Sequence, residues 1–386
     1  MAGDSFLDKS ININATAGFE IKRINRSRII RLFCQNSALS RRDLQVATNL
    51  SLPTISQNIS ELMETGLIVK SGSITYTGGR NAETFSLNAR ARLAVGLDIT
   101  KHHIVLVLVD LLGNIVYVSR TLRPYENSER YFRYLGELVR NTLKANRIPY
   151  NHVIGVGLGI PVLTSIDNTK IVYSKIMDWD GLDANILSEY LGFPVKLYND
   201  ANAACQAELH VLDETEQNGF YIMLSTNVGG AIFINHSVYT GNDFRGGEIG
   251  HLIIHKDGKP CYCGQKGCLE AYCSANALTS ISNNSVDAFF DMLDAGNEEA
   301  EHLLDVYLND LAIAIKSVRI LFNCPVIIGG YIGTRIERYI PKLCAILEQH
   351  HTFDTNTDYI KVCRFDKKAI AVGSALPAIT EFLESF

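Results

Sequence analysis

The chain has 386 residues, of which 47% are hydrophobic and 20% are charged, and this composition is typical of a soluble globular protein with two or three domains. No run of about 18 apolar residues occurs, and the N-terminus MAGDSFLDKS lacks the basic and apolar regions of a secretory signal, so we expect neither membrane insertion nor export. The nine cysteines are scattered through apolar stretches, which favours a reducing cytoplasm over a disulfide framework.

The net charge of −5 is unevenly distributed along the chain. Residues 20–92 contain eleven Lys and Arg against five Asp and Glu, whereas residues 93–386 carry a net charge of −10. A basic segment of this kind favours binding to a polyanion. A basic surface that is merely solvated is the alternative, so the motifs within the segment must decide.

Residues 20–90 are expected to form an α+β winged helix-turn-helix DNA-binding domain, preceded by an N-terminal tail over residues 1–19. Ser40 and Asp43 have the spacing of a capping box, which predicts the start of a helix. Ala47 should face the core of the domain.

The next predicted helix begins near Pro53 and ends at Gly66. Its apolar residues recur with helical spacing, and its small polar residues face outward, so this helix suits the major groove of DNA. Two short strands should follow around a Gly-Gly-Arg loop, and they predict a wing with Arg80 at its tip. A helical hairpin used for dimerisation is the alternative, but the charge favours DNA. The predicted DNA contacts are Arg41, Arg42, Thr54, Ser56, Gln57, Ser60 and Arg80.

From residue 93 onward, buried strands alternate with helices, as in an α/β protein with mixed sheets. Within this part, GEIGHLIIHKDGKPCYCGQKGCLEAY contains the pattern H-x9-C-x-C-x4-C, formed by His251, Cys261, Cys263 and Cys268. Four nitrogen and sulfur ligands suit a closed tetrahedral zinc site, so we expect one structural Zn²⁺ per chain. A histidine and free thiols in an ordinary loop are the alternative.

The segments GGEIGH, CYCGQKGCLEAY, YNDANAA and GLDITKHHIVLVLVDLLG together resemble the ROK family of sugar kinases and sugar-responsive repressors. The resemblance covers nearly all of residues 93–386 and implies a two-lobed α/β domain of the actin-like ATPase fold. It also implies a zinc loop, residues 251–268, that holds part of a sugar pocket. The winged helix-turn-helix in front of it is similar to the regulator branch of the family.

The resemblance implies a set of sugar-binding side chains, in which Asp200 matches the general base of the kinases. Carboxylates and amides exchange hydrogen bonds with adjacent hydroxyls, and a histidine can bind a metal through one ring nitrogen and a sugar through the other. The alternative is that an Asn-Asp pair caps a helix and that Glu248 is a surface charge. The implied sugar-binding residues are Asn199, Asp200, Glu248, His251 and Glu270.

The segments that contact ATP in ROK kinases depart from the family pattern. The first phosphate loop, D-x-G-G-T, is replaced by Asp98-Ile99-Thr100-Lys101-His102, and the second, G-T-G-x-G, by Ser225-Thr226-Asn227-Val228-Gly229. A third glycine-rich segment has become Gly329-Gly330-Tyr331. Since glycines let backbone N–H groups approach phosphates closely, we expect no kinase activity, with Asp200 as a vestigial base.

The sequence therefore predicts a non-catalytic, cytoplasmic transcriptional regulator of carbohydrate uptake or metabolism genes. It is expected to be a repressor that binds operator DNA and, as effector, a sugar or sugar phosphate. A palindromic operator requires a homodimer, and a homotetramer is possible. One alternative is a ROK kinase that phosphorylates a hexose or N-acetylhexosamine with ATP. Another is a regulator that responds to a protein such as a sugar-transport component.

Overall fold

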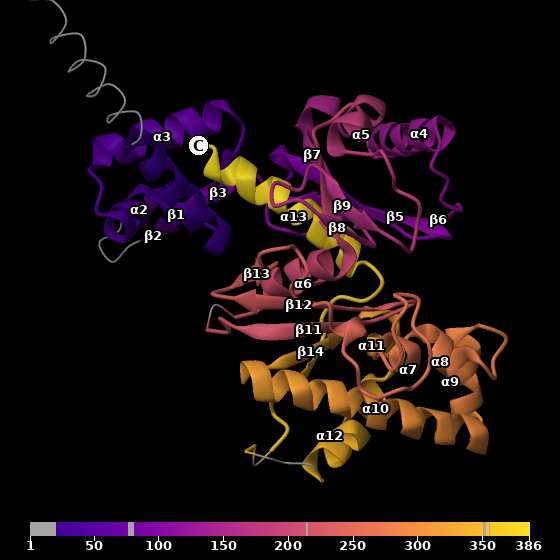
Figure 1. Cartoon of the computed structure of the whole chain (residues 1–386). Helices are drawn as coiled ribbons and strands as arrows, with labels where there is room; N and C mark the ends of the chain where they lie inside the picture. Colours follow the sequence, from indigo (N-terminus) through magenta and orange to yellow (C-terminus); the bar gives the residue numbers. More distant parts are fainter. Residues whose placement is uncertain (1–20, 76–80, 214, 350–352, 355) are drawn as a thin grey trace, which may run out of the picture.

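The structure is a computed structural model that describes residues 21–75, 81–213, 215–349, 353–354 and 356–386. A small head is followed by two lobes, each built on a five-stranded sheet (Figure 1). The mixed sheets and alternating helices confirm the predicted α/β class. No helix in the described part of the chain is both long and apolar enough to cross a membrane.

The head combines three helices with a small sheet in the order β1-β3-β2. Its elements are a helix over residues 21–35, β1 (Leu39–Ser40), α2 (Arg41–Thr48), α3 (Leu52–Glu64), β2 (Ile68–Thr75) and β3 (Asn81–Leu87). The predicted capping box is confirmed, because Ser40 Oγ accepts the N–H of Asp43 while the Asp43 carboxylate accepts the N–H of Ser40. Ser51 caps α3 in a similar way.

The core of the head is apolar, with Ile29, Phe33, Ile55 and Phe85 fully or almost fully buried. The expectation for Ala47 was wrong, since this residue is exposed. The neighbouring Thr48 is buried instead. Its hydroxyl donates a hydrogen bond to Leu44 O at 2.6 Å, so burial leaves no unpaired polar group.

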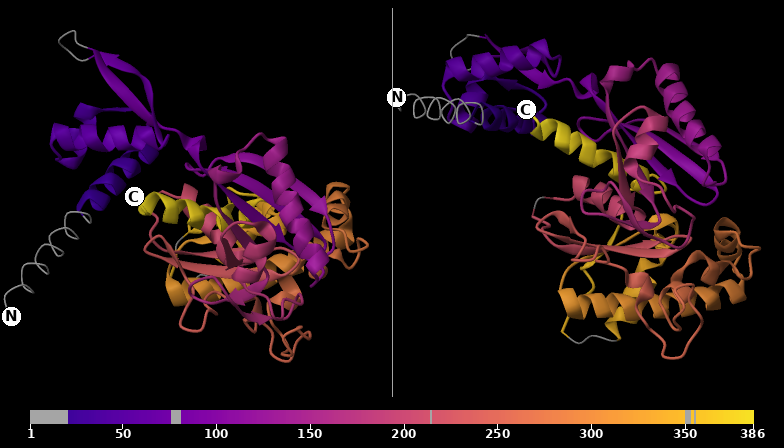
Figure 2. Two further views of the ribbon diagram at one scale, coloured as in Figure 1. Left: turned by 90° about the horizontal axis from the view of Figure 1, so that it is seen from above. Right: turned by 45° about the horizontal axis from the view of Figure 1, so that its top comes forward.

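The β2–β3 hairpin extends away from both lobes, in the manner of a wing (Figure 2). The predicted tip residue Arg80 lies outside the residues that the structure describes.

The first lobe has a sheet in the order β10-β7-β4-β5-β6, in which β10, β7 and β4 are parallel. Helices α4 and α5 cover one face, where an apolar cluster includes the fully buried Trp179. The elements of this lobe are β4 (Leu93–Ile99), β5 (His103–Asp110), β6 (Ile115–Leu122), α4 (Glu129–Ala145), β7 (Val153–Ile160), β8 (Val162–Thr164), β9 (Ile171–Ser174), α5 (Ala184–Leu191) and β10 (Val195–Asn199).

The second lobe has a sheet in the order β13-β12-β11-β14-β15 and a long helix, α10, packed against it. Its strands are β11 (Gly219–Leu224), β12 (Val228–Ile234), β13 (Ser237–Tyr239), β14 (Val326–Gly329) and β15 (Ile360–Val362). Its helices are α6 (Asp200–Val211), α7 (Glu270–Cys273), α8 (Ala275–Thr279), α9 (Val286–Asp294), α10 (Glu298–Phe322), α11 (Gly330–Arg335) and α12 (Ile340–Glu348).

The last helix, α13 (Ala369–Glu384), crosses from the lobes to the head (Figure 1). It packs on the first sheet so closely that a Cβ atom at Gly157 would be 1.7 Å from Ser374 O. At its far end, Arg31 of the head forms an ion pair with Glu384, with Nη2 and Oε1 3.2 Å apart. The helix therefore contacts both the sheet of the first lobe and the head.

Candidate functional site

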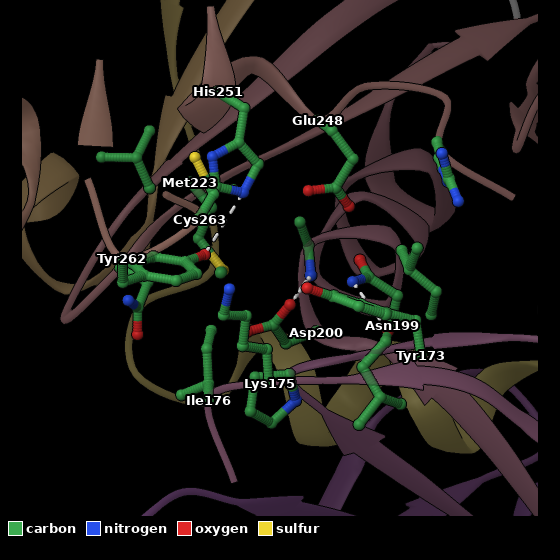
Figure 3. A pocket seen from close by; sticks show the side chains of 18 of the residues that line it. Tyr173, Lys175, Ile176, Asn199, Asp200, Met223, Glu248, His251, Tyr262 and Cys263 are labelled. Carbon is green, nitrogen blue, oxygen red and sulfur yellow. Dashed lines mark hydrogen bonds between the residues drawn. The ribbon is translucent and has the colours of Figure 1, made fainter. Parts of the chain in front are cut away.

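A cavity of about 420 Å³ lies between the two lobes (Figure 3). The first lobe contributes the segments 161–163 and 173–176, and the second contributes residues that follow β11 and β13. Such a volume lies within the range of small-molecule sites, roughly 300–1,000 Å³. Four of the five predicted sugar-binding residues line it, namely Asn199, Asp200, Glu248 and His251.

Asn199 occupies the junction at which β10 ends and α6 begins. Its Oδ1 accepts the N–H of Asn202 and caps α6, while its Nδ2 donates to Val162 O at 3.1 Å. The helix-cap interpretation of this residue is therefore confirmed. One Nδ2 hydrogen is left for a molecule in the cavity.

Asp200 is the first residue of α6, and its Oδ1 accepts the N–H of Ala201 at 2.8 Å. Burial raises the pKa of its carboxyl to about 7, and the negative charges of Glu248 and Glu270 contribute to the rise. Behind it, burial and the charge of Asp200 raise the pKa of Asp98 to about 8. Asp200 can thus exchange a proton near neutral pH.

Glu248 precedes a 3-10 turn over Ile249–His251, and His251 is the last residue of that turn. Gly247 precedes this turn with φ of 88°, and a Cβ atom there would be 2.7 Å from Gly230 O, so a glycine is needed for the chain to turn into the cavity. Burial raises the pKa of the Glu248 carboxyl. Both side chains point toward the cavity in Figure 3.

Glu270 does not line the cavity. It is 6% exposed, and its carboxylate accepts the N–H of Val228 at 2.6 Å and the Nδ2–H of Asn227 at 3.0 Å. Asn227 and Val228 themselves line the cavity. Glu270 therefore holds the loop that forms one wall of the cavity. The resemblance predicted that Glu270 binds the sugar, and it did not distinguish direct contact with a ligand from support of the wall.

The four predicted metal ligands are brought together, with their ligand atoms all within 4.8 Å of one another. The sulfurs of Cys263 and Cys268 are 3.7 Å apart, and Cys261 Sγ is 3.8 Å from Nδ1 of His251. With a Zn–S distance of about 2.3 Å, two sulfurs of a tetrahedral site lie roughly 3.8 Å apart. The donor set and its spacing fit a zinc ion.

His251 connects the metal ligands to the cavity. Its Nδ1 faces the cysteines, while its Nε2 lies 3.4 Å from the hydroxyl of Tyr262. Tyr262 lines the cavity and is flanked in the sequence by two of the predicted ligands. Its position between two predicted metal ligands was a signal that the sequence analysis did not use, because a residue in the same short loop as His251 lies close to the cavity.

Four further polar side chains of the cavity wall were not anticipated from the sequence. Val162 and Lys175 also line the cavity, beside the predicted sugar-binding residues. The unanticipated residues are Tyr173, Arg245, Tyr262 and Gln265.

In the segment Asp98–His102, which corresponds to the first phosphate loop of the kinases, the side chain of Thr100 forms hydrogen bonds with the backbone that follows it. Thr100 Oγ1 accepts the N–H groups of His102 and His103 at 3.4 and 3.1 Å, and the N–H of Thr100 donates to His103 O. In the second segment, the N–H of Val228 donates to Glu270. The N–H groups of His102, His103 and Val228 are thus already hydrogen-bonded within the protein.

Six of the seven predicted DNA contacts lie in α2 and α3 of the head, and the seventh, Arg80, lies outside the described residues. Gln57 and Ser60 are exposed, as is Arg42. The guanidinium of Arg41 pairs with Glu83 at 3.1 Å and lies 4.7 Å from the ring centroid of Phe85, so it also supports the wing. Thr54 and Ser56 are partly buried.

Comparison with known families finds two matches. The ROK family matches residues 94–381, and a winged helix-turn-helix DNA-binding family matches residues 22–69. A putative xylose repressor from Caldicellulosiruptor sp. (strain Rt8B.4) is 23% identical, over 94% of this chain and 97% of its own length. An N-acetylmannosamine kinase from Escherichia coli O6:H1 is 32% identical, but over 41% of this chain and 56% of its own length.

Among solved structures, the chain is similar in fold to a ROK family transcriptional regulator described as a homolog of the E. coli MLC protein. The TM-score is 0.75 with 22% sequence identity, and the similarity covers 94% of this chain and 97% of that one. The likeness extends over the head as well as the lobes.

Proposed function

The chain belongs to the ROK family, and we propose that it is a sugar-responsive transcriptional repressor that binds operator DNA through its head. The observation that carries this proposal is the joining of a winged helix-turn-helix head to a two-lobed domain with a polar cavity. The similarity to a repressor extends over 94% of the chain, whereas the similarity to an N-acetylmannosamine kinase covers 41% of it and that to a solved ROK hexokinase covers 75%. The genes it controls would serve carbohydrate uptake or metabolism.

The sugar would bind in the cavity between the lobes, through Asn199, Asp200, Glu248 and His251. Each offers a hydrogen-bonding atom of the kind that ring hydroxyls exchange with. A site built in this way rejects an analogue that lacks a hydroxyl, because a buried polar group is then left unpaired. Glu270 would act indirectly, by holding the loop at Asn227 and Val228.

His251, Cys261, Cys263 and Cys268 would hold one zinc ion per chain, which would cross-link the loop structurally. Because four protein side chains complete a tetrahedral set, no ligand position remains for a reacting water. Nδ1 of His251 faces the cysteines, so the zinc site would fix the ring with Nε2 toward the cavity. The loop would thereby become a rigid wall of the sugar site.

The sugar would reach the head through two helices. Helix α6 begins at Asp200 in the cavity, and α13 packs along it and ends against the head at Glu384. A ligand that prefers one arrangement of the lobes would shift α6 and, through it, the head. A homodimer acting in the cytoplasm would place two heads on a palindromic operator, and a tetramer or a partner such as a transport protein is compatible with this scheme.

A sugar kinase is the second candidate, and it is favoured by Asp200, which matches the general base of ROK kinases, and by the similarity to an N-acetylmannosamine kinase. The hydrogen bonds from His102 and His103 to Thr100 argue against it, since they occupy N–H groups that a phosphate would need. A coupled ATP assay over hexoses and N-acetylhexosamines decides between the two. If the wild-type protein phosphorylates a sugar and Asp200→Asn does not, the protein is a sugar kinase and the regulator proposal is wrong.

The regulator is tested with a DNA duplex selected from a random library by the full-length protein. Operator affinity is measured by fluorescence anisotropy at fixed salt, with and without each sugar of a panel. We expect at least one sugar to shift operator affinity by about 5- to 150-fold in the absence of ATP, the usual range of allosteric coupling. Unchanged operator affinity with every bound sugar would refute a sugar-responsive regulator.

A further inference from the structure

The outer side of α10 carries an exposed apolar stripe. Val306, Ile313 and Ile320 are 44%, 40% and 55% exposed, and they follow one another at intervals of seven residues. Asn309 and Lys316 occupy the positions between them, so the five residues recur in steps of three and four. We call these five residues the α10 stripe. Their spacing is the heptad pattern of a helix that packs against another helix, whereas exposed apolar residues elsewhere are usually scattered singly.

The opposite side of α10 already packs inside its own lobe. Leu304, Leu308, Leu311 and Ile315 are fully or almost fully buried there, while the helix lies along the side of the second lobe away from the head (Figure 1). A surface helix with one buried face ordinarily presents a polar face to water. Among the helices of the described residues, no other carries more than two exposed large apolar side chains, whereas α10 carries five. This second apolar face indicates a partner outside the chain.

From this pattern we propose that the α10 stripe packs against α10 of a second copy of this chain, with the two helices antiparallel. The proposal rests on the proposed function for its purpose, since a palindromic operator needs two heads, and it names the surface that brings the two copies together.

The charges of α10 favour a second copy in the antiparallel sense. Residues 298–310 contain five acidic residues and no Lys or Arg, whereas residues 311–322 contain two basic residues and no acidic ones. A parallel pair would set the two acidic halves against each other, but an antiparallel pair sets each acidic half against a basic half. Glu298 and Lys316 form no ion pair with another described residue, so both charges are available to a partner.

The stripe is also complementary to itself. Because α10 spans residues 298–322, two antiparallel copies that overlap fully have their common midpoint at residue 310. In that register Asn309 lies beside Asn309 of the second copy, and Val306 lies opposite Ile313 on both sides of the two-fold axis. Asn309 Nδ2 donates one hydrogen to Asp305 O, which leaves its second hydrogen and Oδ1 for the facing amide. A polar pair within an apolar seam fixes the register of paired helices.

A helix of a different protein is the competing occupant of the stripe. Such a helix could cover the three apolar residues equally well, but nothing would then require α10 to be complementary to its own reversed copy. The competing occupant also predicts a different mass, because the purified protein would then be a monomer.

Sedimentation equilibrium of the full-length protein, without DNA or sugar, tests the pairing. The wild-type protein should be a dimer at micromolar concentrations. Ile313→Asp should raise the dissociation constant about 100-fold or more, because each dimer would bury two carboxylates without partners. Ile313→Ala, which keeps a good helix former at this position, should raise it about tenfold. The matched control is Leu122→Asp, at an 81% exposed position of β6 in the first lobe, and it should dimerise as wild type.

A charge exchange tests the antiparallel sense. Glu298 and Lys316 are 18 residues apart, which is five helical turns, so they lie on the same side of α10. In the antiparallel pair each comes within reach of the other residue on the second copy. Lys316→Glu should therefore weaken the dimer, and Glu298→Lys in the same chain should restore much of the loss. A double variant that dimerises no better than Lys316→Glu alone would contradict the antiparallel arrangement.

Two results would overturn the inference and leave the repressor proposal standing. One is a wild-type protein that remains monomeric while it binds operator and responds to sugar. The other is a pair of Ile313 variants that retain the helical circular dichroism of the wild type and also its dissociation constant, which would place the dimer contact elsewhere. If no sugar alters operator affinity, the proposed function itself fails, whatever the oligomeric state.

Discussion

Gly373 of α13 lies against the carbonyl oxygen of Ala203 of α6, and a Cβ atom at position 373 would be only 1.7 Å from that oxygen. The two helices therefore touch through their backbones. Since close-packed interiors transmit displacement instead of absorbing it, a movement of α6 at the cavity must move α13. This contact makes α13 the element that joins the cavity to the head.

Gly373→Ala should destabilise the protein by about 1–3 kcal/mol, because the added methyl group forces the two helices apart. The free energy of unfolding from urea titration measures this. The matched control is Gly333→Ala in α11, where a Cβ atom would be 3.4 Å from its nearest neighbours, an ordinary contact. If the two variants have the same free energy of unfolding, the helices α6 and α13 can move apart without loss of stability, and the prediction is wrong.

Phe382→Ala should weaken the communication between sugar and operator while leaving sugar affinity intact. Phe382 lies on the part of α13 next to the head, and the guanidinium of Arg92, in the connection to the head, lies 5.9 Å from its ring centroid. The ratio of operator affinities with and without sugar should fall toward one. Thr380→Ala, at an exposed position of the same helix, is the control. An unchanged ratio in Phe382→Ala would exclude this end of α13 from the signal.

Purified protein should contain about one zinc per chain by elemental analysis, and Cys263→Ser should lose both the metal and the response to sugar. The response is lost because the wall that carries Tyr262 and orients His251 would no longer be fixed. Cys344→Ser provides the control, since Cys344 lies outside the group of metal ligands. A folded, chelator-washed protein that responds to sugar without zinc would contradict the structural role.

Sugar affinity should rise as the pH increases through about 7. Burial raises the pKa of Asp200 to about 7, and the deprotonated carboxylate accepts hydrogen bonds from hydroxyls with both oxygens. Calorimetric titrations between pH 5.5 and pH 8.5, roughly 1.5 units on either side of this pKa, measure the profile. Asp200→Asn should make sugar affinity independent of pH in this range. If the variant keeps the inflection near pH 7, another titrating group causes it.

Stability should depend on pH in the opposite sense. The folded-state pKa of Asp200 lies above the ordinary value of 3.8, so the folded protein binds more protons than the unfolded chain between about pH 4 and pH 7. The free energy of unfolding attributable to this group therefore falls as the pH rises through that window. Asp200→Asn should lessen the fall, which urea titrations at several pH values detect.

Two exposed residues of the head should affect DNA binding differently. Arg42→Ala should weaken binding to all duplexes and reduce the slope of log affinity against log salt by about one, because a phosphate contact is lost. Gln57→Ala should relax sequence preference, since Gln57 lies on the helix expected in the major groove. Competition between selected and random duplexes at several salt concentrations separates the two effects. If the two variants change affinity and sequence preference in the same way, α3 does not read bases in the major groove as expected.

Features that depend on spacing along the chain could be predicted from the sequence. The capping box at Ser40 and the clustering of the ligands in one short loop follow from local geometry, which side chains a few residues apart share. The direction of the Glu270 carboxylate could not be predicted in this way. It is set by the N–H of Val228, which is 42 residues away in the sequence.

The sequence by itself determined the α/β class, the winged head and four of the polar residues in the cavity, because hydrophobic periodicity and motif spacing are local properties. Only the tertiary structure decided that Lys175 and Arg245 face one cavity from opposite lobes and that α13 reaches the head. Arg31 and Glu384 are separated by 353 residues, so no periodic pattern in the sequence relates them. They meet only because the folded lobes position α13 so that its end reaches the head.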